Sequence, residues 1–225
     1  MRVRDHLKRL HRFLKRNSFY AVLLSSLLSH GLLAGRIYVS GDASYGFMLW
    51  NLILAWLPYV FGLMAAAFDR RYRSAWALLV PGLLWLLFFP NGPYMLTDLI
   101  HLEPRAPIPM WYDIVLLTAF AWTGCLLAVA SLNMMQSLIR AWLGRLMSWL
   151  FVVLTLGLTG LGIYLGRFLN WNSWDVFLQP GDVIADVLTR LTHPLEYLGV
   201  YGVTFLFAAF LFVFYLAFVS ARASE

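Results

Sequence analysis

Six long apolar stretches without Asp, Glu, Lys or Arg divide the chain, and they constrain its fold more than any other feature. They run at 19–35, 45–68, 74–89, 114–139, 146–166 and 197–220. A helix needs about 20 residues, with a range of about 17 to 25, to cross the hydrocarbon core of a bilayer. The stretches therefore predict an all-α, polytopic membrane bundle of six transmembrane helices.

The composition favours the same class. Of the 225 residues, 12% are charged and 61% are hydrophobic, whereas a soluble domain has about a quarter charged residues. One soluble core cannot bury so much apolar surface, so lipid must solvate much of it. The predicted organisation is a basic cytoplasmic segment at 1–18, a six-helix transmembrane domain at 19–220 and a short cytoplasmic tail at 221–225.

Basic residues are unevenly distributed between the connections. With the N-terminus inside, the inner segments hold 13 of the 17 Lys and Arg residues, and the outer segments hold four. Lys and Arg are enriched in cytoplasmic loops, so both termini are predicted to lie in the cytoplasm. This pattern and the lack of eukaryotic targeting signals indicate a bacterial inner (plasma) membrane.

The first sixteen residues contain seven of the Lys and Arg residues, and Val3, Leu7, Leu10 and Leu14 recur there at helical spacing. This predicts a basic amphipathic helix that binds anionic lipids of the inner leaflet. A nucleic-acid-binding arm is the weaker interpretation, because no base-reading motif accompanies it. A cleaved signal peptide over 1–34 lacks a convincing small-x-small cleavage site, so an uncleaved first span is expected.

The third stretch is short and ends in residues that break helices. Its 16 residues reach about 24 Å as a helix, less than a hydrocarbon core of about 30 Å. The run PNGP at 90–93 cannot continue the helix. Broken backbone at membrane depth persists only where protein covers it or a water-filled cavity lines it. We therefore expect a polar recess open to the outer face, with Asn91, Tyr94 and Thr97 as substrate-binding candidates.

Asp98 and His101 follow in a predicted short helix at 94–102, where a separation of three residues places them on one face. The pair suits acid–base catalysis or two metal ligands. In the structural alternative, Thr97 or Asp98 caps the helix and His101 bonds the backbone. The cofactor, if there is one, is left open by the sequence.

A second polar run, RFLNWNSWD, extends from Arg167 to Asp175. If the preceding helix continues through it, Arg167, Asn170 or Trp171, and Asp175 share one face. Arg can hold a phosphate or carboxylate through two parallel hydrogen bonds. Arg167 and Asp175 are thus further catalytic candidates, and Asn170, Trp171 and Asn172 are binding candidates. An aromatic belt with an anchoring Arg is the alternative.

Three other features have structural interpretations. Asp113 is predicted to be a helix N-cap, with a role in the recess as the lesser alternative. Residues 180–191 predict an outer interfacial helix with an internal Asp186/Arg190 pair. Gly162 and Gly166 predict close helix packing, within the chain rather than in a dimer.

The two polar runs, together with Trp111-Tyr112-Asp113, resemble the bacterial membrane proteins grouped as domain of unknown function 1361. The resemblance extends over the last four stretches and most of the chain. It implies a multi-pass membrane architecture and favours the same polar residues. It implies no particular activity.

Three function classes remain open. The first is a membrane enzyme that acts at the outer face on a lipid or lipid-linked anionic group. The second is a structural or assembly subunit, in which case a homo-oligomer or a membrane partner is expected. A transporter is less favoured, because the stretches carry no charges and show no inverted repeat. ATP and dinucleotide chemistry are disfavoured, because no Walker loop or GxGxxG motif is present.

Overall fold

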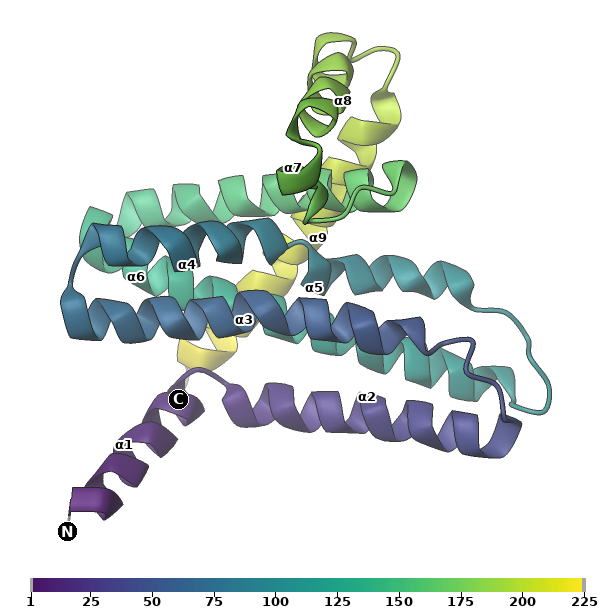
Figure 1. Cartoon of the computed structure of the whole chain (residues 1–225), viewed down its shortest axis with the longest axis horizontal. Coiled ribbons are helices and arrows are strands. Elements are labelled where there is room, and N and C mark those ends of the chain that lie inside the picture. The colour runs from purple at the N-terminus through teal and green to yellow at the C-terminus, as the bar shows by residue number, and fades with distance from the viewer. Residues whose placement is uncertain (1, 224–225) are drawn as a thin grey trace.

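The computed structural model describes residues 2–223 and confirms the all-α class (Figure 1). The helices are α1 (Arg2–Arg16), α2 (Phe19–Ser40), α3 (Phe47–Tyr72), α4 (Ala75–Phe88), α5 (Asn91–Tyr94), the 3-10 helix η1 (Met95–His101), α6 (Met110–Leu169), α7 (Asp175–Leu178), α8 (Pro180–Thr192) and α9 (Leu198–Ala223). Within the described residues, five segments are long and apolar enough to cross a membrane: α2, α3, Trp76–His101, α6 and α9.

The longest helix, α6, consists of two helices joined at Gly144. Its 60 residues would reach about 90 Å as one rod, far more than a bilayer core. Gly144 has φ 86° and ψ 178°, a conformation that residues with a Cβ rarely adopt. The chain reverses direction there (Figure 1), so the predicted stretches at 114–139 and 146–166 lie on opposite arms of α6.

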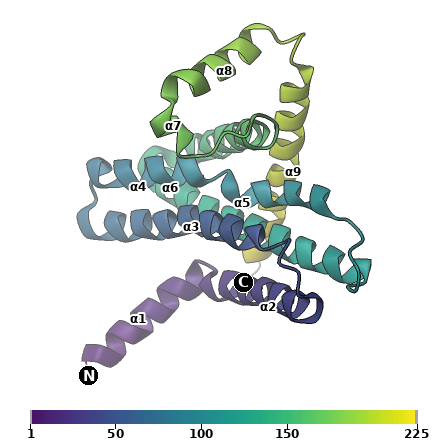
Figure 2. The same ribbon diagram turned by 45° about the vertical axis from the view of Figure 1, so that its right-hand side comes forward.

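The bundle has two chemically different ends. One end carries the α2–α3 connection at 41–46 and the η1–α6 connection at 102–109, and we call it the far end. The opposite end, the basic end, carries Gly144, the α3–α4 connection and α1, which projects away from the bundle (Figure 2). Side chains of residues 2–6 and the tail residues 224–225 lie outside the described residues.

The regular helix is interrupted after the third stretch, as predicted, but Phe89 and Pro90 keep right-handed helical backbone angles. The expectation that this span stops short is wrong, because Trp76–His101 is long and apolar enough to cross a membrane as one segment. Glycines determine how the interruption packs. α4 ends at Phe88 and the chain resumes as α5 at Asn91. A Cβ on Gly92 would lie 2.8 Å from the carbonyl oxygen of Gly124, on the first arm of α6. A Cβ on Gly162, on the second arm, would lie 2.9 Å from Pro90. The break is therefore held between the two arms of α6.

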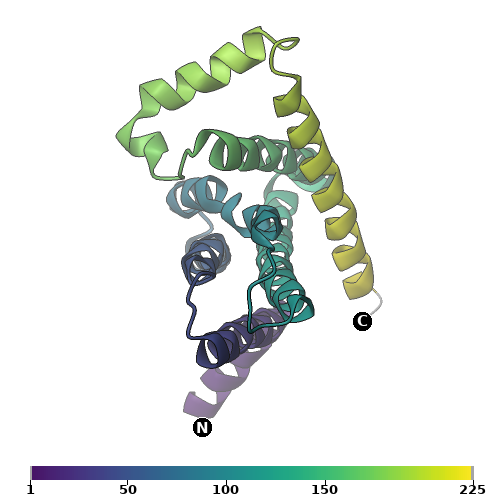
Figure 3. The same ribbon diagram turned by 90° about the vertical axis from the view of Figure 1, so that its right-hand side faces the viewer.

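The C-terminal helices α7, α8 and α9 (Asp175–Ala223) lie on one side of the bundle (Figure 3). In Figure 3, α9 runs beside α6, and α7 and α8 connect the C-terminal end of α6 to the start of α9. The predicted helix at 180–191 is confirmed as α8. Val183 is its buried residue, whereas Ile184, Leu188 and Leu191 are exposed.

Substitution of Gly124 tests the packing of the break. A Cβ at this position would meet the carbonyl oxygen of Gly92, and neither backbone can give way freely. Gly124→Ala is expected to lower the free energy of unfolding by about 1–3 kcal/mol, as other overpacked sites do. The measurement is equilibrium unfolding in mixed micelles.

Gly157→Ala is the matched control, because it lies on the same helix and a Cβ there would meet nothing within 4 Å. It should leave stability unchanged or slightly raised, since Ala favours helix. Equal effects of the two substitutions would contradict the close approach of α5 and α6.

Candidate functional site

The two predicted polar runs meet at the far end through Arg167. This residue lies in the last turn of α6, and its Nη2 donates to Asp98 Oδ1 at 2.6 Å. Its Nε and Nη2 also donate to the hydroxyl of Thr97, at 2.9 Å and 2.6 Å. The guanidinium thus joins η1 to the second arm of α6. The two polar runs were predicted to lie close together, and this contact agrees with that prediction.

Asp98 is almost completely buried, with 1% of its surface exposed. Its second oxygen, Oδ2, accepts a hydrogen bond of 2.8 Å from Nδ2 of Asn51, on α3. Both carboxylate oxygens therefore have donors, and one is a cation. A buried charge is costly unless it is paired and hydrogen-bonded, and this carboxylate meets both conditions.

His101 lies at the exposed edge of the same network. Its Nε2 is 3.3 Å from Nη1 of Arg167, and a guanidinium has only donors, so Nε2 must be the acceptor. The ring packs edge-on against Phe47 at 5.2 Å between centroids.

The alternative cap role of Thr97 or Asp98 is wrong, because Tyr94 occupies the N-cap position of η1.

A second buried ion pair, which the sequence did not predict, lies nearby. Arg36 on α2 donates to Asp113 on α6 at 2.8 Å, and these residues are 1% and 0% exposed. Arg36 also contacts Asp42 at 3.2 Å. The predicted N-cap role of Asp113 is wrong, because α6 begins at Met110 with Pro109 in the cap position. Asp113 instead fastens α2 to α6.

The run after Arg167 does not continue as a helix. Asn170 ends α6 with a left-handed φ of 58°, so the expectation of one helical face from Arg167 to Asp175 is wrong. Asp175 lies apart from the Asp98 network and accepts from the backbone N–H and the amide of Asn172 at 2.7 Å and 3.2 Å. These contacts order the turn that leads into α7.

Trp171 connects this turn to α8. Its indole N–H donates to Asp186 Oδ2 at 2.7 Å, and Asp186 also pairs with Arg190 at 3.0 Å, as the spacing predicted. The indole N–H, together with the Arg190 guanidinium, holds the pKa of the Asp186 carboxyl below its ordinary value. The pair and the indole hold α8 against the end of α6.

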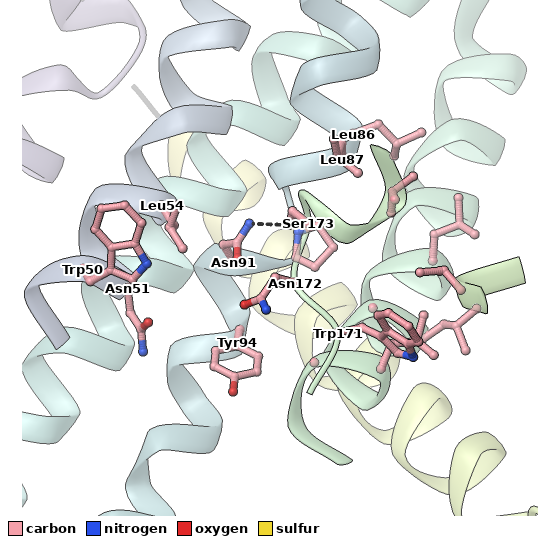
Figure 4. A pocket seen from close by; sticks show the side chains of 18 residues that line it. Trp50, Asn51, Leu54, Leu86, Leu87, Asn91, Tyr94, Trp171, Asn172 and Ser173 are labelled. Atoms are coloured by element: carbon pink, nitrogen blue, oxygen red, sulfur yellow. Dashed lines mark hydrogen bonds between the residues drawn. The ribbon is translucent and has the colours of Figure 1, made fainter. Parts of the chain in front are cut away.

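A cavity of about 380 Å³ lies between α3, α4, α5, the second arm of α6 and the turn before α7. Four predicted binding residues line it: Asn91, Tyr94, Trp171 and Asn172. Figure 4 shows Asn91, Asn172 and Tyr94 between Trp50 on one side and Trp171 on the other. The other predicted site residues do not line it: Thr97, Asp98, His101, Arg167, Asn170 and Asp175.

The cavity has a polar end and an apolar end. The polar end is formed by amide, hydroxyl and indole side chains: Trp50, Asn51, Asn91, Tyr94, Trp171, Asn172 and Ser173. Apolar residues and glycines line the remainder: Leu54, Leu86, Leu87, Pro90, Leu158, Leu161, Gly162, Leu165, Gly166, Val176 and Val183. Small-molecule sites typically enclose about 300–1,000 Å³ with a few polar groups in a mostly apolar wall, and this cavity has both properties.

Asn51, Tyr94 and Asn91 connect the cavity to the rest of the far end. Asn51 lines the cavity and donates to Asp98. The guanidinium of Arg167 lies 4.7 Å from the centroid of the Tyr94 ring, and Arg167 itself does not line the cavity. Asn91 donates to Ser173 Oγ at 3.0 Å and so joins α5 to the turn. The buried ion pair therefore positions two cavity-lining residues without lining the cavity itself.

Asn51, Trp50 and Ser173 are site residues that the sequence interpretation missed. Asn51 is the one amide in the apolar stretch at 45–68. A polar side chain inside a span is a candidate functional residue by default. The sequence therefore contained a signal that could have identified Asn51.

The predicted metal pair gains no third ligand in the structure. Within residues 2–223, no group of three or more His, Cys, Asp and Glu side chains is placed to hold an ion. A cation at Asp98 would have to displace Arg167 from a 2.6 Å contact. The metal role of Asp98 and His101 stays a prediction.

The apolar helices define a protein suited to several passes through a bilayer. The chain belongs to the family described as protein of unknown function (DUF1361), whose model matches residues 50–219. This range includes every residue of the cavity and both partners of the Arg167–Asp98 pair. No curated protein and no solved structure matches the chain.

Removal of Arg167 tests the buried pair. Arg167→Met leaves the Asp98 carboxylate buried without its cation, and such a change costs about 3–5 kcal/mol. The double variant Asp98→Asn/Arg167→Met removes both charges and should recover much of that loss. Equilibrium unfolding in mixed micelles measures both.

Glu103→Gln is the control, because the Glu103–Arg105 pair is exposed at both partners. Its cost should stay below about 1 kcal/mol. If Arg167→Met costs no more than this control, the ion pair does not hold the far end together.

Proposed function

We propose that this chain is a six-span bacterial inner-membrane protein that binds a lipid or lipid-linked molecule from the outer face, in the cavity beside α5. The observation that carries the proposal is the amphipathic lining of that cavity, polar near the far end and leucine-rich deeper between α4 and α6. A molecule with a polar head and a hydrocarbon tail matches both parts, because each part of the ligand meets a surface of its own kind.

The reversal at Gly144 supports six spans, since each arm of α6 carries one of the predicted apolar stretches. Arg140 and Arg145 flank this reversal, and the positive-inside rule places it with both termini in the cytoplasm. The far end, with the cavity, then faces outward. The domain limits remain those predicted: 1–18, 19–220 and 221–225.

α1 and α8 are proposed to lie along the two membrane surfaces. α1 exposes Leu7 and Leu10 beside its basic residues, which suits an anionic inner leaflet. α8 exposes an apolar face beside the bundle, between the end of α6 and the start of α9 (Figure 1), and an interfacial helix there can rest in the outer leaflet.

Binding accounts for the geometry better than catalysis by the predicted pair. Asp98 and Arg167 neutralise each other and lie behind Tyr94, outside the cavity lining. We assign them the role of positioning Asn51 and Tyr94. Catalysis by Asp98, His101, Arg167 or Asp175, and a role as an assembly subunit, stay hypotheses.

Native mass spectrometry of protein released from its own membrane tests the proposal. The wild-type protein should retain an amphiphile, whereas Leu87→Trp should lose it, because the indole fills the apolar end of the cavity. Leu28→Trp is the control, since Leu28 is 58% exposed on α2 and lies outside the cavity. Equal retention by wild type and Leu87→Trp, or no retention by wild type, would contradict the proposal.

A further inference from the structure

Each of the three amide nitrogens at the polar end of the cavity donates to an acceptor in the protein. Asn91 Nδ2 donates to the carbonyl oxygen of Phe88 at 2.9 Å and to Ser173. Asn51 and Asn172 each donate an amide N–H to a carboxylate, the first to Asp98 and the second to Asp175. Carbonyl and carboxylate oxygens only accept, so the chemistry fixes which end of each amide is the nitrogen.

The amide oxygens, by contrast, remain available as acceptors. Within the described part of the chain, no hydrogen bond reaches Oδ1 of Asn51, Asn91 or Asn172. A ligand group that donates can satisfy them, and a hydroxyl is the simplest such group. A phosphate or carboxylate brings acceptors alone and would face these oxygens without a bond.

None of the residues that line the cavity is charged. The nearest cation, Arg167, is held by Asp98 behind the Tyr94 ring. A charged head group of either sign would lose hydration without gaining an ion partner, and that loss is costly. The lining therefore offers no ion partner to an anionic or a cationic head group.

Aromatic side chains flank the polar end. Trp50 and Trp171 lie on opposite sides of the amides in Figure 4, and Tyr94 lies beside them. Aromatic rings offer apolar faces together with a polar tip. They suit a head group that combines hydroxyls with apolar C–H surface.

From these observations we propose that the cavity takes an uncharged, hydroxyl-rich head group on a hydrocarbon tail, the chemistry of a glycolipid or an alkyl glycoside. This inference rests on the proposed function and specifies its substrate class. It replaces the anionic head group expected from Arg167, because that guanidinium is committed to Asp98 and Thr97.

A set of amphiphiles with one tail and different heads tests the inference. The full-length protein in phosphatidylcholine nanodiscs is titrated with octyl β-glucoside, octyl phosphate and octyltrimethylammonium by calorimetry. Empty nanodiscs correct for partition into lipid. The glucoside should bind at least about tenfold more tightly than either ionic amphiphile, a difference of about 1.4 kcal/mol.

Asn172→Lys provides a variant with a predicted gain. Asn172 is exposed, and a lysine there adds a cation to the lining once Asp175, the carboxylate that Asn172 contacts, is neutralised. Asp175→Asn is therefore added to this variant and to its control. The preference should shift toward octyl phosphate. Thr192→Lys adds the same charge at the end of α8, outside the cavity, and should leave the preference for the glucoside unchanged.

The outcomes separate the two proposals. Wild-type preference for either ionic amphiphile, with binding reduced by Leu87→Trp, would overturn the uncharged head group and leave the amphiphile site intact. No binding of any of the three beyond that of empty nanodiscs would overturn both. Equal shifts in Asn172→Lys and Thr192→Lys would overturn the assignment of the head-group site to the amides.

Discussion

Backbone that breaks within a hydrocarbon solvent must find its hydrogen-bond partners inside the protein, and this constraint organises the far end of the bundle. The break between α4 and α5 frees a carbonyl at Phe88, which accepts from the Asn91 side chain. Gly92 and Gly124 allow α5 to lie directly on α6.

Two buried ion pairs stabilise this arrangement. Arg167–Asp98 fastens η1 to the second arm of α6, and Arg36–Asp113 fastens α2 to the first arm. Tyr45 lies between them, since its hydroxyl donates to the His101 carbonyl at 3.1 Å and its ring lies 4.5 Å from the Arg36 guanidinium. These four charged side chains hold helices together, and the cavity is lined by neutral groups.

Apolar stretches and helix breakers predicted most of the fold. The all-α class, the interruption at Pro90 and the helix at 180–191 follow from local chemistry. The contact of Thr97 and Asp98 with Arg167 agrees with the prediction that their loops lie on one side of the membrane. The partner of Asp113 could not be predicted, because Arg36 is 77 residues away and its burial depends on how α2 packs. The end of α6 was misjudged because Asn170 tolerates a left-handed conformation that sequence spacing does not reveal.

The sequence predicted where the cavity lies along the chain better than it predicted which residues line it. Four of the binding candidates from the two polar runs line the cavity: Asn91, Tyr94, Trp171 and Asn172. Arg167 and Asp98 were also predicted as site residues, because they are charged. They pair with each other, and neither lines the cavity. Which residues line a cavity depends on side-chain packing, and sequence separation carries little of that information.

The central claim is that the cavity opens on the side of the membrane opposite the reversal of α6. Single cysteines at Asn172 and Arg145, both exposed, report on the two sides in a Cys125→Ala background. In intact cells, a membrane-impermeant maleimide should label Asn172→Cys, and should label Arg145→Cys only after the membrane is permeabilised. Labelling of both before permeabilisation, or of Arg145→Cys alone, would contradict the outward-facing site.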